Sequence, residues 1–216
     1  MRQPRSPQEI EAIRERILDQ ALDIISRRGL DALTMRALAA RLDMTAPNLY
    51  NFFANKDELY LSLVVKGFAM LRQALAEARD SAREAAQQAR AMIEAYVRFG
   101  LDHPRYYDIM FTLPTPKHND YLGTPHEALS EKEYRLSMEI AGMARTVIER
   151  IMGEESGPDL IQRRLIQAWS LLHGMISLRH SQVVSYVAGN IPGIYEQTIE
   201  ELMTMVEVVL TPPPGN

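Results

Sequence analysis

The stretch that decides the fold covers residues 33–59 and reads LTMRALAARLDMTAPNLYNFFANKDEL. Thr34 stands directly before an apolar helical pattern, so its hydroxyl is predicted to accept a hydrogen bond from the first turn and to cap a short helix. The same arrangement returns eleven residues later at Thr45. Pro47 then falls in a first helical turn, where its missing N–H breaks no intrahelical hydrogen bond. Asn55 predicts a third cap and a third helix.

The spacing of the first two caps predicts a helix, a turn of about three residues and a second helix. This is the spacing of a helix-turn-helix, in which the second helix enters the major groove of DNA. Asp43 lies in the turn, where the backbone often needs a positive φ. Asp adopts such a φ less readily than Gly but more readily than most residues.

These residues resemble the tetracycline-repressor (TetR) family of bacterial transcription regulators. The resemblance covers about the first sixty residues and rests on an amphipathic helix ending at Gly29, on Thr34 and Thr45, and on the run Leu49-Tyr50-x-x-Phe53-x-x-Lys56-x-x-Leu59. The family usually has Gly where this chain has Asp43. The resemblance implies that Tyr50 and Lys56 contact the phosphate backbone.

The polar and small residues around the second helix are the candidates for DNA contact. Asn pairs with adenine, Ala or Pro packs on a thymine methyl, and hydroxyl groups reach phosphates. A positive side chain beside a helix N-terminus adds to the attraction for an anion. The predicted DNA-binding residues are Thr34, Arg36, Thr45, Ala46, Pro47, Asn48, Tyr50, Asn51 and Lys56. Arg2 and Arg5 fit a disordered end better than an arm in the minor groove.

Composition and charge agree with this interpretation. The 216 residues are 46% hydrophobic and 24% charged, which is ordinary for a globular protein. The net charge is −4, yet residues 1–56 carry nine basic and seven acidic side chains, a net of +2. There is no cysteine. No signal peptide is evident and no apolar run approaches the length needed to span a bilayer, so a cytoplasmic protein without membrane association is expected.

Helical periodicity dominates the whole chain, which predicts an all-α fold. We expect a three-helix head in residues 1–56, joined by a continuous helix to a ligand-sensing and dimerisation domain in residues 57–216. Six helices are expected behind the head, nine in all. Ser81 is predicted to cap the helix after the bridging one, Thr124 the long helix ending near Gly153, and one helix is predicted for residues 157–189.

The second half of the chain offers a candidate sensor. The Trp169…His173-Gly174 pattern, with the segment FGLDHPRYYDIMF before it, resembles the C-terminal ligand-sensing domain of one TetR subgroup. Met and aromatic side chains around one titratable group suit a small, mainly apolar molecule. A filled core has the same composition, so both interpretations stay open. The predicted ligand-binding residues are Met92, Tyr96, Phe99, Tyr107, Phe111, Met138, Met143, Trp169 and His173.

The last two helices are too apolar to face water on every side. They are predicted to form a four-helix bundle across a two-fold axis, which makes the protein a homodimer. The predicted interface residues are Leu165, Leu172, Met175, Ile194, Ile199, Leu202, Met203, Val206 and Val209. A dimer presents two recognition helices and therefore requires a roughly palindromic operator.

The sequence thus predicts a ligand-responsive DNA-binding regulator, in particular a repressor released from its operator by a small molecule. One alternative is a DNA-binding regulator that senses no small molecule. The other is an all-α enzyme using His173 as a general base, which leaves the double cap and Lys56 without a role. The five histidines include no His-x-x-x-His pair and no HExxH, so we expect no metal site. No phosphate-binding or nucleophile motif occurs either, so we expect neither a cofactor nor enzymatic activity.

Overall fold

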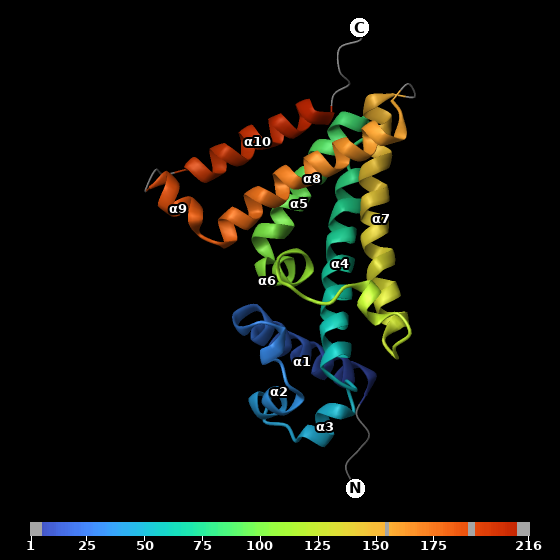
Figure 1. Cartoon of the computed structure of the whole chain (residues 1–216), viewed down its shortest axis with the longest axis vertical. Helices are drawn as coiled ribbons and strands as arrows, with labels where there is room; N and C mark the ends of the chain where they lie inside the picture. The colour runs from blue at the N-terminus through green and yellow to red at the C-terminus, as the bar shows by residue number, and fades with distance from the viewer. Residues whose placement is uncertain (1–5, 154–155, 190–192, 211–216) are drawn as a thin grey trace. The chain divides into compact units, whose positions relative to one another are not determined.

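The computed structural model describes residues 6–153, 156–189 and 193–210 (Figure 1). Within those ranges the chain forms ten α-helices, three short helical turns and no strand, so the predicted all-α fold is confirmed. It divides into two compact units, residues 1–69 with 105–136, and residues 70–104 with 137–216. Arg2 and Arg5 lie outside the described residues.

The first unit contains the predicted head together with a segment far along the chain. Its elements are α1 (Pro7–Arg28), η1 (Leu30–Ala32), α2 (Met35–Arg41), α3 (Ala46–Tyr50), the first part of α4 (Lys56–Asp80), α6 (Pro104–Tyr107), η2 (Asp108–Thr112), η3 (His118–Tyr121) and the start of α7 (Glu127–Met152). The core is built from the apolar faces of α1, α2 and α4. Ile17, Leu38 and Leu63 are fully buried in it.

The predicted caps of the head are present in the structure. The Thr34 hydroxyl accepts a hydrogen bond from the Ala37 N–H at 3.1 Å, and the Thr45 hydroxyl accepts one from the Asn48 N–H at 3.4 Å. Asp43 has φ 53°, as its place in the turn predicts. Each acceptor satisfies a backbone donor that the helix itself leaves without a partner.

Two arginines of α1 hold the irregular backbone on either side of α3. Arg16 donates to the Leu42 carbonyl at 2.9 Å, where α2 ends. Arg14 donates to the Phe52 carbonyl and lies over the Phe53 ring, 4.2 Å from its centroid. These carbonyls follow helix ends and have no intrahelical donor, so the guanidinium groups fix the turns that orient α3.

A buried carboxylate ties α1 to α2 and to α6. Asp23 contacts Arg27 at 2.7 Å and Arg41 at 2.5 Å, and Arg105 lies 3.7 Å away, whereas the Asp23 side chain is only 9% exposed. Burial would raise the pKa of Asp23, but the hydrogen bonds from Arg41 and Arg27 outweigh it and leave the pKa below its usual value. The carboxylate is therefore charged in the folded protein.

The second unit is a bundle of longer helices, with the last part of α4, α5 (Ala85–Asp102), most of α7, α8 (Pro158–His180), α9 (Val183–Ala188) and α10 (Ile194–Leu210). α10 packs on α8 and α5, and α8 packs on α5. The crossing of α5 and α8 is close, because a Cβ at Gly100 would lie 2.7 Å from a side-chain carbon of Ile176. The absent side chain thus makes room for a fully buried isoleucine.

Three predicted boundaries are wrong. The Ser81 hydroxyl donates to the Ala78 carbonyl and closes α4, and α5 begins only at Ala85. Thr124 accepts from the His126 N–H in a turn, and α7 begins at Glu127. The helix expected over 157–189 divides into α8 and α9, because Gln182 takes the left-handed conformation with φ 59°. This division adds a tenth helix to the nine expected.

Helix α4 contradicts the expectation that no apolar run approaches the length needed to span a bilayer. Among the described helices only α4 has a stretch long and apolar enough to cross a membrane, by length and composition alone. Of that stretch 56% is buried inside the protein. Leu63 and Leu71 of α4 are fully buried, and a core helix passes the same test.

The Asp23 contacts predict a pH-dependent stability. Because the folded pKa lies below the unfolded value of about 3.9, the carboxylate stabilises the fold above that pH, and this contribution disappears as pH falls through the folded pKa. Asp23→Asn should cost about 1–2 kcal/mol at pH 7, less than for a fully buried pair because the arginines are partly exposed. Urea unfolding at pH 7, 5 and 3 measures the difference.

The matched control is Asp19→Asn on the same helix. Asp19 is 58% exposed and lies 3.5 Å from Arg105, so its loss should change stability by less than about 0.5 kcal/mol at each pH. Equal effects of the two substitutions would contradict a special role for Asp23.

Candidate nucleic-acid interface

None of the nine predicted DNA-binding side chains is buried. Ala46 and Asn48 are half-buried, and the other seven are exposed: Thr34, Arg36, Thr45, Pro47, Tyr50, Asn51 and Lys56. They come from the starts of α2, α3 and α4 and from the end of α3. The structure therefore leaves these side chains accessible within the first unit, and their contact with DNA stays a prediction.

One side of helix α3 is anchored by buried side chains, and the other side is accessible to solvent. Leu49 is fully buried, and Phe53 just after the helix is 1% exposed. On the other side, Tyr50 is 53% exposed. Asn51 is the C-cap of α3 and is exposed, whereas Asn48 is half-buried. Of the two asparagines predicted as base readers, Asn51 is therefore the more accessible.

The N-terminus of α4 differs from the predicted anion site. The side-chain amide oxygen of Asn55 accepts hydrogen bonds from the Asp57 and Glu58 N–H groups, both at 3.0 Å, so these two groups are not available to a phosphate. Asp57 and Glu58 also place two carboxylates in the first turn. The attraction for a phosphate at this end must come from the Lys56 ammonium rather than from the backbone.

The start of helix α2 differs from the start of α4 in its charged side chains. Its first turn contains no acidic residue, and Arg36 is exposed there. Thr34 keeps a hydroxyl hydrogen to donate after its oxygen has accepted from Ala37. The start of α2 can thus present a cation, a hydroxyl donor and the positive end of a helix to one anion.

The segment 105–136 packs against the head within the first unit, which the sequence analysis did not predict. The Tyr60 hydroxyl donates to the Pro116 carbonyl at 3.1 Å. Gly67 allows close approach of Met110, whose sulfur would lie 2.5 Å from a Cβ at that position. His126 lies 3.0 Å from the side-chain amide of Asn55. Proline and mixed polar residues indicated a loop here, and no local signal showed where it would dock.

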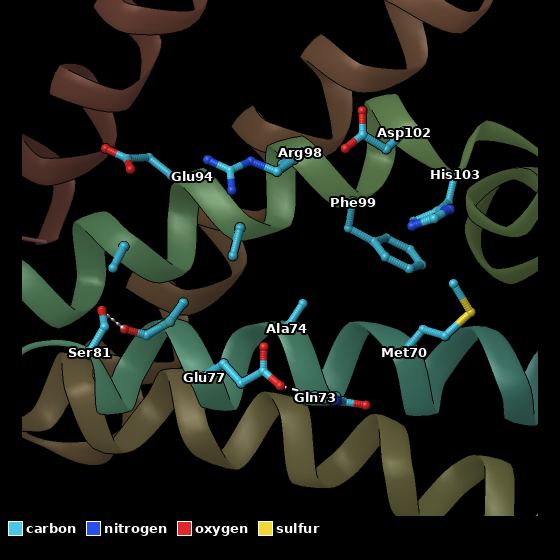
Figure 2. A pocket seen from close by; sticks show the side chains of 13 residues that line it. Met70, Gln73, Ala74, Glu77, Ser81, Glu94, Arg98, Phe99, Asp102 and His103 are labelled. Atoms are coloured by element: carbon cyan, nitrogen blue, oxygen red, sulfur yellow. Dashed lines mark hydrogen bonds between the residues drawn. The ribbon is translucent and has the colours of Figure 1, made fainter.

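A cavity of about 520 Å³ lies between α4 and α5 in the second unit (Figure 2). It is lined by Met70, Gln73, Ala74, Glu77, Ala78, Ser81, Ala91, Glu94, Ala95, Arg98, Phe99, Asp102 and His103. Four alanines form much of its wall. The charged side chains include three carboxylates and one guanidinium, so the lining is mixed in polarity with an acidic excess.

Only Phe99 among the nine predicted ligand-binding residues lines this cavity. Met92 and Tyr96 are buried, Met143 is half-buried, and Met138 is 47% exposed. Tyr107 and Phe111 belong to the first unit, where their rings lie 4.9 Å apart. The structure therefore does not bring the predicted set together in one unit.

The Trp169 and His173 pair lies at the surface of α8. Trp169 is 47% exposed, and its indole N–H donates to the Tyr96 hydroxyl at 2.9 Å. His173 lies 3.3 Å from the Ser177 hydroxyl, and burial together with His180 lowers the pKa of His173. Neither residue lines the cavity between α4 and α5.

The predicted interface residues include four that are buried within the single chain, namely Leu172, Leu202, Met203 and Val206. The remaining five, Leu165, Met175, Ile194, Ile199 and Val209, are half-buried. The most exposed apolar side chains of α8 and α10 are not among the predicted interface residues. Ile166, Trp169 and Leu178 of α8 are 51%, 47% and 47% exposed, and Met205 and Val208 of α10 are 56% and 68% exposed.

The capped pair α2 and α3, with the Asp43 turn between them, defines a protein of the helix-turn-helix class. The chain belongs to the TetR family. Residues 17–63 match the family model of bacterial regulatory proteins of the tetR family, and residues 89–203, more than half of the chain, match the tetracyclin repressor-like C-terminal domain.

Several known proteins are similar to this chain. The uncharacterized HTH-type transcriptional regulator Rv0681 of Mycobacterium tuberculosis is 27% identical over 79% of this chain and 72% of its own. The repressor KstR of Rhodococcus jostii is 40% identical over 26% of each chain. The chain spans only about half the length of other curated relatives, 48% and 45% of theirs.

The fold is shared with solved structures. A TetR-family transcriptional regulator from Bordetella parapertussis has a TM-score of 0.70 at 13% identity, covering 91% of this chain and 94% of its own. An identity this low supports the fold alone.

Proposed function

We propose that this protein is a transcription regulator that binds operator DNA through α2, α3 and the start of α4. The observation that carries the proposal is the exposed polar surface of α3 between two braced turns, with Tyr50, Asn51 and Lys56 all accessible. Repression is the mode we propose, since KstR, a relative over the head, is named a repressor. Selection of bound DNA from a random pool at stated salt tests the proposal, and a palindrome is expected.

A dimer is the second part of the proposal. The exposed apolar side chains Ile166 and Trp169 on α8, and Met205 and Val208 on α10, are spaced three residues apart on each helix. This spacing puts each pair on one helical face. We infer that these faces meet their counterparts across a two-fold axis, which would place two heads on two half-sites.

Release by a small molecule is the third part. The cavity between α4 and α5 supports it, because α4 also carries Lys56 at its first residue. Alanine walls accept an apolar body, and the excess of carboxylates, Glu77, Glu94 and Asp102, favours a positive charge on it. We therefore propose an amphipathic cation as effector, in place of the mainly apolar molecule that the sequence predicts. A bound cation that favours one position of α4 would compete with DNA by linkage.

The proposed DNA contacts predict two different kinds of defect. Lys56→Ala should weaken binding to all sequences similarly and lower the salt slope by about one unit, because one phosphate contact is lost. Asn51→Ala should cost about 1–3 kcal/mol at one operator position and leave non-specific affinity nearly unchanged. Titrations on selected and scrambled DNA at several salt concentrations measure both.

The control for these titrations is Lys132→Ala, which removes an exposed charge on α7 and should leave the slope unchanged. If Lys56→Ala altered the preferred sequence while the slope stayed constant, the phosphate role would be wrong. If Asn51→Ala left the selected half-site unchanged, Asn51 would not read bases.

Two nearby valines of α10 predict opposite outcomes for the dimer. Val208 is 68% exposed and Val206 is fully buried. Val208→Glu should separate the subunits while helix content is kept. Val206→Glu should unfold the chain, because an unpaired carboxylate in the core costs several kcal/mol. Sedimentation and circular dichroism measure the two effects, and a folded dimer of the Val208→Glu variant would move the interface elsewhere.

The cavity predicts which substitution blocks the effector. Ala95→Phe fills the space between α4 and α5, so the concentration of effector needed for DNA release should rise at least about tenfold. His173→Leu lies outside the cavity and should leave that concentration unchanged. The measurement is operator affinity with and without a molecule found by thermal-shift screening. The reverse result would return the effector site to Trp169 and His173.

A further inference from the structure

The side-chain amide of Asn55 has only one possible orientation. Its two contacts with the backbone come from the Asp57 and Glu58 N–H groups, both at 3.0 Å. Only the amide oxygen can accept from an N–H, so the oxygen faces α4 and the NH₂ group faces the other way. The NH₂ group faces His126, whose Nε2 lies 3.0 Å from the Asn55 side-chain nitrogen.

This orientation fixes the protonation state of His126. The Asn55 NH₂ group can only donate, so His126 Nε2 must accept, and the imidazole must be neutral with its proton on Nδ1. An imidazolium ring would place an N–H donor against the NH₂ donors. Protonation therefore breaks the contact between His126 and Asn55.

The groups around His126 include one aromatic ring and several charged side chains. The Tyr121 ring of η3 meets the imidazole edge to face, 6.3 Å between centroids. Burial raises the pKa of Tyr121, with the charge of Asp57 acting in the same direction, so its hydroxyl stays neutral at physiological pH. The charged side chains on the elements that meet at this contact are Lys56, Asp57 and Glu58 in the first turn of α4, Asp120 of η3 and Glu127 of α7, the residue after His126.

The carboxylates in that set act in the same direction as the lost hydrogen bond. An imidazolium ring would be drawn to a carboxylate and away from the amide of Asn55. The backbone of His126 is itself fixed, because its N–H donates to the Thr124 hydroxyl at 3.2 Å. We therefore expect the change at the imidazole and at the amide that caps α4.

We propose that His126 is a positioning residue for the DNA-binding end of α4, and that it acts only while its imidazole is neutral. It holds Asn55, Asn55 holds the first turn of α4, and that turn carries Lys56. The inference rests on the proposed function in one respect, that Lys56 contacts DNA. Protonation of the imidazole on acidification then lowers operator affinity.

The test compares wild type with His126→Gln, His126→Leu and His118→Gln between pH 8 and 5.5 at constant ionic strength. Glutamine keeps an acceptor for the Asn55 amide but does not titrate, whereas leucine has no acceptor. His118, which contacts Ser130 and Glu131 in the same segment, is the matched control. Affinity for the selected operator is expressed relative to His126→Gln at each pH, so that titrations elsewhere cancel.

At pH 8 we expect wild type and His126→Gln to bind equally and His126→Leu about fivefold more weakly, the factor for one lost hydrogen bond. As pH falls from 8 to 5.5, wild type should fall towards the relative affinity of His126→Leu. His118→Gln should keep the wild-type profile. If wild-type affinity relative to His126→Gln stayed constant as pH fell, or if His126→Leu bound like wild type at pH 8, the proposal would be overturned.

A second measurement needs no DNA. Hydrogen-exchange protection of the Asp57 and Glu58 amides, which Asn55 caps, should fall about fivefold in His126→Leu. It should fall in wild type as pH is lowered from 8 to 5.5, and it should persist in His126→Gln. Unchanged protection in His126→Leu overturns the inference whatever the DNA result. If the protection pattern were as expected but wild type did not bind the operator at pH 8, the proposed function alone would be refuted.

Discussion

Every feature of the head depends on giving partners to the backbone groups at the ends of very short helices. Helix α3 has five residues and α2 has seven, and helices of that length are unstable in water by themselves. The side chains of Thr34, Thr45 and Asn55 accept hydrogen bonds from N–H groups at the starts of α2, α3 and α4. Arg14 and Arg16 donate hydrogen bonds to carbonyls that follow the ends of α3 and α2. The chain can therefore present α3 as an exposed helix while burying little more of it than Leu49.

The same local character explains what the sequence could predict. A cap needs one hydroxyl or amide two or three residues before its partner, so the Thr34 and Thr45 caps can be predicted from their neighbours alone. The positive φ of Asp43 is predicted from its place in the turn, where the TetR family usually has Gly. Ser81 shows the limit of that reasoning. Its hydroxyl had two helix ends within reach and bonds the end of α4 rather than the start of α5.

Contacts between distant segments could not be predicted in this way. The apolar residues of α8 and α10 indicate two amphipathic helices, but not which face each turns inward. Leu202 and Val206 could have faced a partner subunit, and the packing on α8 and α5 places them in the core. The alanine-lined cavity likewise depends on the spacing of α4 and α5, whereas the aromatic residues expected as its wall mostly fill cores.

The docking of segment 105–136 also separates chemistry from position along the chain. His126 and Asn55 are 71 residues apart and are joined by a single polar contact. Neither residue is unusual in its own sequence context, so only the fold gives the pair a meaning. Polar contacts of this kind are specific, because a wrong pairing leaves a donor facing a donor.

The crossing of α5 and α8 has a consequence for how this chain can diverge. A Cβ at Gly100 would come within 2.7 Å of Ile176, so position 100 accepts a larger residue only if position 176 accepts a smaller one. Gly67 and Met110 also approach closely in the other unit, where the flexible methionine side chain could shift more easily. Each pair should therefore vary jointly among descendants of this sequence, and such paired exchanges would reveal both helix crossings without any coordinates.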